Sequence, residues 1–211
     1  MLGQHTEFYP STHSIALKIA KICGDYRYAN GRSSKSNFRI IDPSAGNGVL
    51  LDELRSSWMF KNCEISAIEI DPDLRHILTG KGYSVIDRDW LTYREPTSFN
   101  IIVMNPPFSD GIHHALKAWD YLADDGLLVC VVPDTMLDEG NSHKQRLSAL
   151  IAQFGSVESI GQAFRDGVRR TGVECSIVTL IKPKAAIKTG STKTGAIKML
   201  IKKLAEETKA N

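Results

Sequence analysis

The chain has 211 residues, of which 42% are hydrophobic, and a formal net charge of +2. This length and composition indicate one domain with a single sizeable core, and no stretch approaches the ~20 consecutive apolar residues of a membrane span. The four cysteines lie far apart without a Cys-x-x-Cys pair, which disfavours a metal site. We therefore expect a cytoplasmic protein without a metal, since the amino terminus also lacks a signal-peptide pattern.

Positive charge is concentrated at the carboxyl end. From Lys182 to Asn211 there are eight lysines and two glutamates, a balance of +6, so the other residues sum to −4. We divide the chain into a folded domain over 1–182 and a basic tail over 183–211, in which 196–205 has the pattern of a short amphipathic helix. The tail suits a polyanionic partner, although a merely solvated tail has the same composition.

Short strands and helices alternate along the domain. Its first helix is expected over 13–23, capped by Ser11 or Thr12 and ended by Gly24, with a polar loop over 25–37. Strands are expected over 38–41, 64–70, 83–86, 99–104, 127–132, 157–160 and 175–181, and further helices over 49–60, 72–80, 112–122 and 142–154. This order predicts an α/β fold: a seven-stranded, mostly parallel sheet with helices on both faces and a C-terminal β-hairpin.

A glycine-rich turn over 42–48, Asp-Pro-Ser-Ala-Gly-Asn-Gly, connects the first strand to a helix, as in a nucleotide-binding βαβ unit. Glu69 ends the second strand 21 residues after Gly48, where an acid can accept hydrogen bonds from ribose hydroxyls. Asp89 and Trp90 follow the third strand, and together they could read an adenine through its amine and its ring face. A surface carboxylate, a turn acid and a core aromatic are simpler interpretations of the same residues.

Asn105-Pro106-Pro107-Phe108 closes the apolar strand over 99–104. The Asn105 side-chain oxygen and the Pro106 carbonyl are two acceptors beside an aromatic face, which suits a planar amine attached to a ring. With both amine hydrogens held, the nitrogen lone pair leaves conjugation and becomes nucleophilic. The alternative is a loop whose prolines merely end a strand.

Two further features lie in the second half of the chain. The loop over 162–172 contains Phe164, Arg165, Arg169 and Arg170, and it could receive nucleic acid, with arginines on phosphates and the phenyl ring on a base. An ordinary hairpin loop is the alternative. His113 and His114 are adjacent near the start of a helix, so they point in different directions and at most one is expected to contact a ligand.

Together these motifs resemble those of the class I S-adenosylmethionine-dependent methyltransferases, over residues 8–182. The 42–48 turn, Asn105-Pro106-Pro107-Phe108 and their order are similar to those of gamma-group DNA adenine-N6 methyltransferases. Residues 9–12, Tyr-Pro-Ser-Thr, resemble the motif that closes over the methionine, with Thr12 in place of a proline. The implied cofactor-binding residues are Tyr9, Pro10, Ser11, Thr12, Asp42, Pro43, Ser44, Ala45, Gly46, Gly48, Glu69, Ile70, Asp89, Trp90 and Asn105. The implied catalytic residues are Asn105, Pro106, Pro107 and Phe108, and the candidate substrate-binding residues are Phe108, Phe164, Arg165, Arg169 and Arg170.

The resemblance implies a Rossmann-like fold, S-adenosylmethionine as cofactor, and methylation of the N6 amine of adenine in DNA, with the adenine flipped against Phe108. Two alternatives stay open: an amino-methyltransferase acting on RNA or a protein glutamine, and a non-catalytic subunit with the methyltransferase fold. Gamma-group DNA enzymes usually continue into a large target-recognition domain, whereas here only the basic tail follows. We therefore expect a methyltransferase with loose specificity, or one whose recognition comes from short loops, a partner subunit or a second copy.

Overall fold

The computed structural model describes residues 11–30, 38–162, 164 and 172–184. The strands are β1 (Arg39–Asp42), β2 (Glu64–Ile68), β3 (Ser84–Asp87), β4 (Phe99–Met104), β5 (Leu122–Pro133), β6 (Gly155–Gly161) and β7 (Cys175–Ile181). The helices are α1 (His13–Ala29), α2 (Val49–Ser56), α3 (Pro72–Gly80), α4 (Gly111–Tyr121) and α5 (Ser142–Phe154), with short 3₁₀ helices η1 (Trp58–Phe60) and η2 (Asp134–Met136). Within these ranges no helix is both long and apolar enough to cross a membrane.

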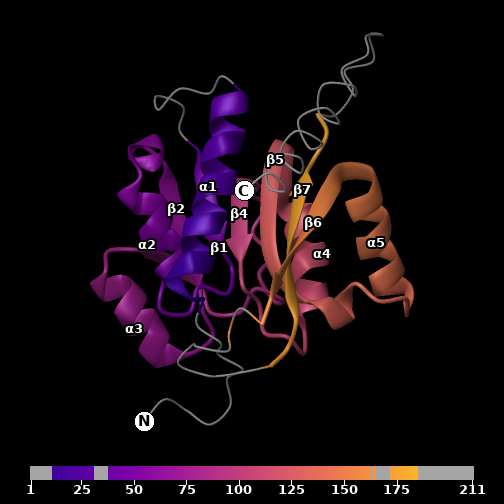
Figure 1. The fold of residues 1–211 in the computed structure, drawn as a ribbon. Coiled ribbons are helices and arrows are strands. Elements are labelled where there is room, and N and C mark those ends of the chain that lie inside the picture. Colours follow the sequence, from indigo (N-terminus) through magenta and orange to yellow (C-terminus); the bar gives the residue numbers. More distant parts are fainter. Residues whose placement is uncertain (1–10, 31–37, 163, 165–171, 185–211) are drawn as a thin grey trace.

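All seven strands form one sheet in the order β3-β2-β1-β4-β5-β7-β6 (Figure 1). The strands from β3 to β5 in this order are parallel, and β7 is antiparallel to both β5 and β6. The predicted mostly parallel sheet and its carboxyl-terminal β-hairpin are therefore confirmed. The strand order reverses between β1 and β4, and in open α/β sheets ligands bind in the crevice at such a reversal.

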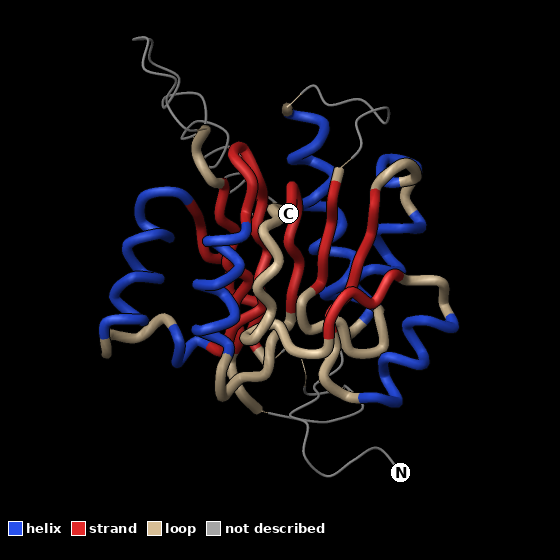
Figure 2. Tube along the Cα trace, turned by 180° about the vertical axis from the view of Figure 1, so that it is seen from behind, coloured by secondary structure: helices blue, strands red, loops and turns tan. Residues whose placement is uncertain are grey.

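Helices cover both faces of the sheet and enclose two cores (Figures 1 and 2). One core packs α1, α2 and α3 against one face, and the other packs α4 and α5 against the opposite face. Neighbouring strand residues alternate between them, so that Ile40 and Ile101 belong to the first core and Ile41 and Ile102 to the second. Burial on both faces explains the continuous apolar runs of β4 and β5.

The first helix is longer than the sequence predicted. It runs past Gly24 to Ala29, and Asn30 caps it by donating its backbone N–H to the Tyr26 carbonyl oxygen at 3.2 Å. Tyr26 and Arg27 are both 1% exposed, and the Arg27 guanidinium lies 4.4 Å from the centroid of the Phe38 ring. Burial of these side chains outweighs the ~1 kcal/mol that a glycine costs a helix, so the predicted loop from residue 25 was wrong as far as Ala29.

Two other boundaries differ from the predicted ones by more than two residues. The helix expected over 49–60 ends at Ser56, because Ser57 adopts an extended conformation, and the chain resumes as η1. Strand β5 begins at Leu122 rather than after the Asp-Asp-Gly turn predicted before residue 127. Asp125 within it has a positive φ of 55°, and the pairing with β4 shifts register there, so the expected turn is an irregularity inside the strand.

Candidate functional site

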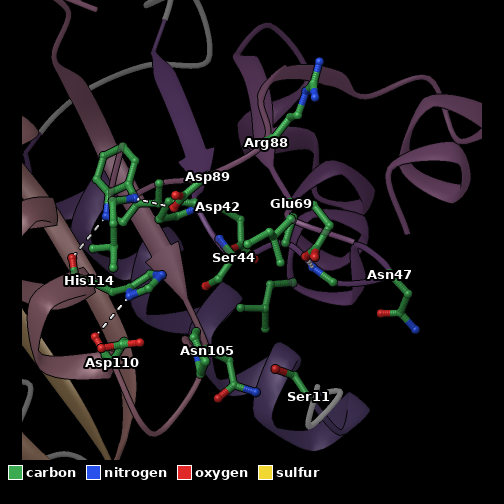
Figure 3. Close-up of a pocket in the computed structure, with 18 of the residues that line it drawn as sticks. Ser11, Asp42, Ser44, Asn47, Glu69, Arg88, Asp89, Asn105, Asp110 and His114 are labelled. Atoms are coloured by element: carbon green, nitrogen blue, oxygen red, sulfur yellow. Dashed lines mark hydrogen bonds between the residues drawn. The ribbon is translucent and has the colours of Figure 1, made fainter. Parts of the chain in front are cut away.

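A pocket of about 380 Å³ lies where the loops after β1, β2, β3 and β4 meet the start of α4 (Figure 3). These loops gather at one edge of the sheet because the carboxyl ends of parallel strands share an edge (Figure 2). The predicted cofactor residues that line the pocket are Ser11, Asp42, Pro43, Ser44, Ala45, Gly46, Glu69, Ile70, Asp89, Trp90 and Asn105.

Two predicted cofactor residues that the structure describes, Thr12 and Gly48, do not line it. Thr12 caps α1 instead, because its hydroxyl accepts the backbone N–H of Ile15 at 3.4 Å. Gly48 has a φ of 87° and donates its N–H to the Ala45 carbonyl oxygen at 2.8 Å. A Cβ on Gly48 would approach Leu78 Cδ2 to 3.0 Å, so this glycine shapes the turn rather than contacting a ligand. Tyr9 and Pro10 lie outside the described residues.

Glu69 ties two loops of the pocket together. One carboxylate oxygen of Glu69, which is labelled in Figure 3, accepts the Gly46 N–H at 2.6 Å. The other accepts the Asp71 N–H at 2.9 Å. The side chain is 7% exposed, and burial raises the pKa of Glu69 while the two N–H groups oppose that shift. Each carboxylate oxygen has a second lone pair, so Glu69 can still accept a hydrogen bond from a ligand hydroxyl.

The floor of the pocket is acidic and polar. Asp42 is 1% exposed, and its Oδ1 accepts the Ser44 N–H at 3.0 Å. Burial and, to a smaller extent, the charge of Glu69 raise the pKa of Asp42 to about 8. The hydrogen bond from the Ser44 N–H stabilises the ionised carboxylate and so acts in the opposite direction. The buried Ser44 hydroxyl has no hydrogen-bond partner among the described residues. Two buried acids and an unsatisfied hydroxyl favour a ligand with a cationic, hydrogen-bonding end.

This arrangement predicts opposite effects of Asp42→Asn on stability and binding. Because the folded-state pKa of about 8 exceeds the usual 3.8, the folded protein binds more protons than the unfolded chain between these values. Stability is therefore lost as the pH rises through this window. At pH 8 we expect a higher melting temperature for the variant, since Asn keeps the Ser44 acceptor without the charge, and at least tenfold weaker binding of a cationic ligand.

Thermal melts at pH 5 and pH 8 and calorimetry with S-adenosylmethionine measure the two effects. Asp25→Asn is the matched control, because Asp25 forms an i,i+4 ion pair with Lys21 at a solvent-accessible position, and it should change neither quantity appreciably. A variant of Asp42 that melts lower at pH 8 and binds as tightly as the wild type would contradict the assignment of a buried anionic role.

The wall after β3 is built around Trp90. Its indole N–H donates to the His114 carbonyl oxygen at 3.2 Å, and its ring packs on Tyr93 and Tyr121 at centroid distances of 5.7 and 5.0 Å. The indole is 1% exposed, so a stack over a ligand ring, as the sequence suggested, would require this cluster to open. Asp89 is half-buried and accepts the Leu91 N–H at 2.8 Å through Oδ1.

Two lysines that no sequence motif marked, Lys81 and Lys117, hold loops of the pocket in place from outside it. Lys81 Nζ donates to the Asn47 carbonyl oxygen at 2.7 Å and to Asp52 at 2.5 Å. Lys117 Nζ donates to the carbonyl oxygens of Leu91 and Tyr93 at 3.0 and 2.6 Å, and burial, with the Arg94 charge, lowers the pKa of Lys117 to about 8. Each lysine thus fixes the backbone of one loop.

The tetrapeptide Asn105-Pro106-Pro107-Phe108 follows the buried strand β4, and its residues Asn105 and Pro107 line the pocket. Phe108 is half-buried, and its ring makes an edge contact with Phe164 at a centroid distance of 6.0 Å. Phe164 is 0% exposed in the first core, so its predicted role of stacking on a substrate base was wrong. Although Phe164 belongs to an arginine-rich stretch of the sequence, its ring packs in the core, where it contacts the ring of Phe108. Arg165, Arg169 and Arg170 lie outside the described residues.

No protein-family model matches the chain. It is 27% identical to the type II methyltransferase M.CvrRI of Paramecium bursaria Chlorella virus XZ-6E, over 47% of this chain and 31% of that protein. The chain therefore spans less than a third of the length of this curated relative.

Solved structures of methyltransferases have the same fold. The methyltransferase subunit of a type I restriction-modification system from Streptococcus thermophilus has a TM-score of 0.70 and 18% identity, covering 97% of this chain and 53% of that one. A class I S-adenosylmethionine-dependent methyltransferase from Listeria monocytogenes has a TM-score of 0.65 and 16% identity, covering 90% and 65%. The fold is that of the class I methyltransferases. S-adenosylmethionine, the cofactor expected from the sequence, is the cofactor of the class I methyltransferases whose fold this chain has.

Proposed function

We propose that the protein is an S-adenosylmethionine-dependent methyltransferase that acts on the N6 amine of adenine in DNA. One observation carries the proposal: Asn105 and Pro107 of the tetrapeptide line the same pocket as the acids Asp42, Glu69 and Asp89. A ligand held by the three acids would therefore lie against the acceptor that holds the target amine. A relative named as a type II methyltransferase and a solved structure named as the methyltransferase subunit of a type I restriction-modification system support DNA as the substrate.

The cofactor, when bound, supplies an activated methyl group. Asp42 would face its cationic amino-acid end, Glu69 would accept from its ribose hydroxyls, and Asp89 would accept from its adenine amine. Gly46, at a φ of 56°, lets the backbone approach closely. Holding donor and acceptor in line can contribute about 7–11 kcal/mol to lowering the barrier in well-oriented reactions.

The tetrapeptide prepares the target amine. The Asn105 side-chain oxygen and the Pro106 carbonyl accept its two hydrogens and stabilise the positive charge that develops on nitrogen during attack. Phe108 stacks on the flipped base, and Phe164 supports the phenyl ring from within the core. No base is needed before methyl transfer, because the amine proton becomes acidic only afterwards.

The same pair of acceptors would serve an amine of RNA or the amide of a protein glutamine, so the substrate class needs a direct test. Tritiated methyl transfer to DNA, RNA and protein in parallel, followed by nucleoside analysis, separates these possibilities. We expect label in N6-methyladenine from DNA. Label only in RNA or only in protein would mean that this molecule, and not DNA, is the substrate. If the protein binds the cofactor but labels none of the three substrates, the non-catalytic subunit is favoured.

The basic tail is proposed to contribute DNA affinity without specificity. Cutting the chain after Lys184 removes six of its lysines. Each phosphate contact contributes a slope of about −0.9 in log affinity against log salt, so the slope should shrink by several units while sequence preference stays unchanged. Salt titration of DNA binding measures this. A lowered melting temperature or lost self-association, with an unchanged salt slope, would instead assign the tail to packing or to a partner subunit.

A further inference from the structure

His114 lies in the wall of the pocket, in the first turn of α4, and is 7% exposed. Its ring Nδ1 is 3.0 Å from the main-chain carbonyl oxygen of Asp110 (Figure 3). A carbonyl oxygen can only accept a hydrogen bond, so Nδ1 must carry the proton of the neutral ring. Nε2 is then an acceptor without hydrogen, and among the described residues it has no partner.

The surroundings keep this ring neutral. Burial, with a smaller effect of the neighbouring His113, lowers the pKa of His114 below its usual 6.5. The Asp110 carbonyl and the charges of Asp110 and Asp89 oppose that shift without reversing it. Near pH 7 the His114 ring therefore presents an acceptor, and it becomes a donor only in acid.

The position of the His114 ring shows which part of the pocket it faces. In Figure 3 the His114 side chain lies between Asp89 and Asn105, with its unpaired nitrogen directed into the pocket. The His114 carbonyl oxygen also holds the indole N–H of Trp90 at 3.2 Å, so the residue belongs to the Asp89-Trp90 end of the site. Asp89 and His114 thus provide two acceptors, from the loop after β3 and from α4, in the lining of one pocket.

We propose that Nε2 of His114 accepts one hydrogen of the cofactor's adenine amine while Asp89 accepts the other, which makes the site selective for an amine over an oxo group. The inference rests on the proposed function, since it takes the cofactor to be S-adenosylmethionine. An exocyclic amine offers two hydrogens in the ring plane, which match two acceptors. An oxygen at the same position would face both acceptors without a hydrogen to share, and such mismatches discriminate strongly.

Calorimetry with S-adenosylhomocysteine and with S-inosylhomocysteine, in which an oxo group replaces the amine, tests the proposal. The wild type should prefer the adenosyl compound by about a hundredfold or more. His114→Leu should reduce that preference roughly tenfold, and His114→Gln, which can return an acceptor, should restore most of it. Melting temperatures of the two variants identify any general damage, which would weaken both compounds equally.

The pH dependence adds a readout that a packing role would not produce. As the pH falls and His114 gains a proton, Nε2 becomes a donor, so the wild type should lose its preference for the amine, whereas His114→Leu should not change in this way. Equal preference in the wild type and His114→Leu at every pH would overturn the inference. Failure of the wild type to bind S-adenosylhomocysteine at all would instead overturn the proposed function.

Discussion

Asn105→Ala should lower methyl transfer by on the order of a hundredfold or more while leaving affinity for S-adenosylhomocysteine nearly unchanged. The reason is the position of the side chain. Asn105 follows the buried strand β4 and lines the pocket, where we propose that its oxygen holds the target amine. Its hydrogen bond strengthens as charge develops on the amine nitrogen, so the loss appears in turnover rather than in cofactor binding.

Asn100→Ala is the matched control. Asn100 lies on the same strand at its opposite end, where its side-chain oxygen accepts the backbone N–H of Arg39 at 2.9 Å. The same truncation there should leave turnover within a few-fold of the wild type. Single-turnover kinetics on saturating DNA give the comparison. If Asn105→Ala keeps normal turnover, the tetrapeptide only ends a strand and the mechanism is wrong.

The sequence predicted most reliably what depends on neighbours in the chain. Strand β4 is an apolar run buried on both faces, and the residues after a parallel strand must lie at the carboxyl edge, so Asn105, Asp42, Glu69 and Asp89 could be brought together from their positions alone. Pro72 also marked the start of α3 correctly, because its missing N–H costs nothing in a first helical turn.

The predictions that failed depend on contacts between distant residues. Gly24 is a sound local signal for a helix end, yet Tyr26 and Arg27 gain more from burial than the glycine costs. Phe164 is in an arginine-rich loop by sequence and in the core by packing. No sequence pattern predicts that α1 continues past Gly24 or that Phe164 is buried, because each depends on which distant residues the side chains pack against.

The residues that support the pocket could not be predicted from the sequence for a related reason. Lys81 and Lys117 donate hydrogen bonds to backbone carbonyl groups 34 and 26 positions away. Every residue type has such a carbonyl group, so the sequence does not indicate which ones the lysines contact. His114 is similar, since its role depends on the Asp110 carbonyl fixing which nitrogen holds the proton. A sequence can therefore name the groups that meet a ligand, but the groups that orient them emerge only from the fold.

Glu69→Gln is expected to weaken binding of S-adenosylhomocysteine roughly tenfold or more. The wild-type carboxylate accepts from Gly46 and Asp71 at once and keeps lone pairs that we propose accept from the ribose hydroxyls. A glutamine has one oxygen and one NH₂ group, so one of the two backbone N–H groups must face a donor. A hydrogen bond to a charged group contributes about 1.5–3 kcal/mol, and the variant loses that acceptor together with the fixed distance between the two loops.

Glu64→Gln provides the control on the same strand, since Glu64 begins β2 at an exposed position far from its carboxyl end. It should bind the ligand as the wild type does. Hydrogen exchange of the Gly46 and Asp71 amides separates the two functions of Glu69, because loosened loops expose these amides even without ligand. If Glu69→Gln exchanges faster and still binds normally, Glu69 only shapes the loop and the ribose assignment fails. If binding weakens with unchanged exchange, the carboxylate contacts the ribose directly, since the loop it supports has kept its structure.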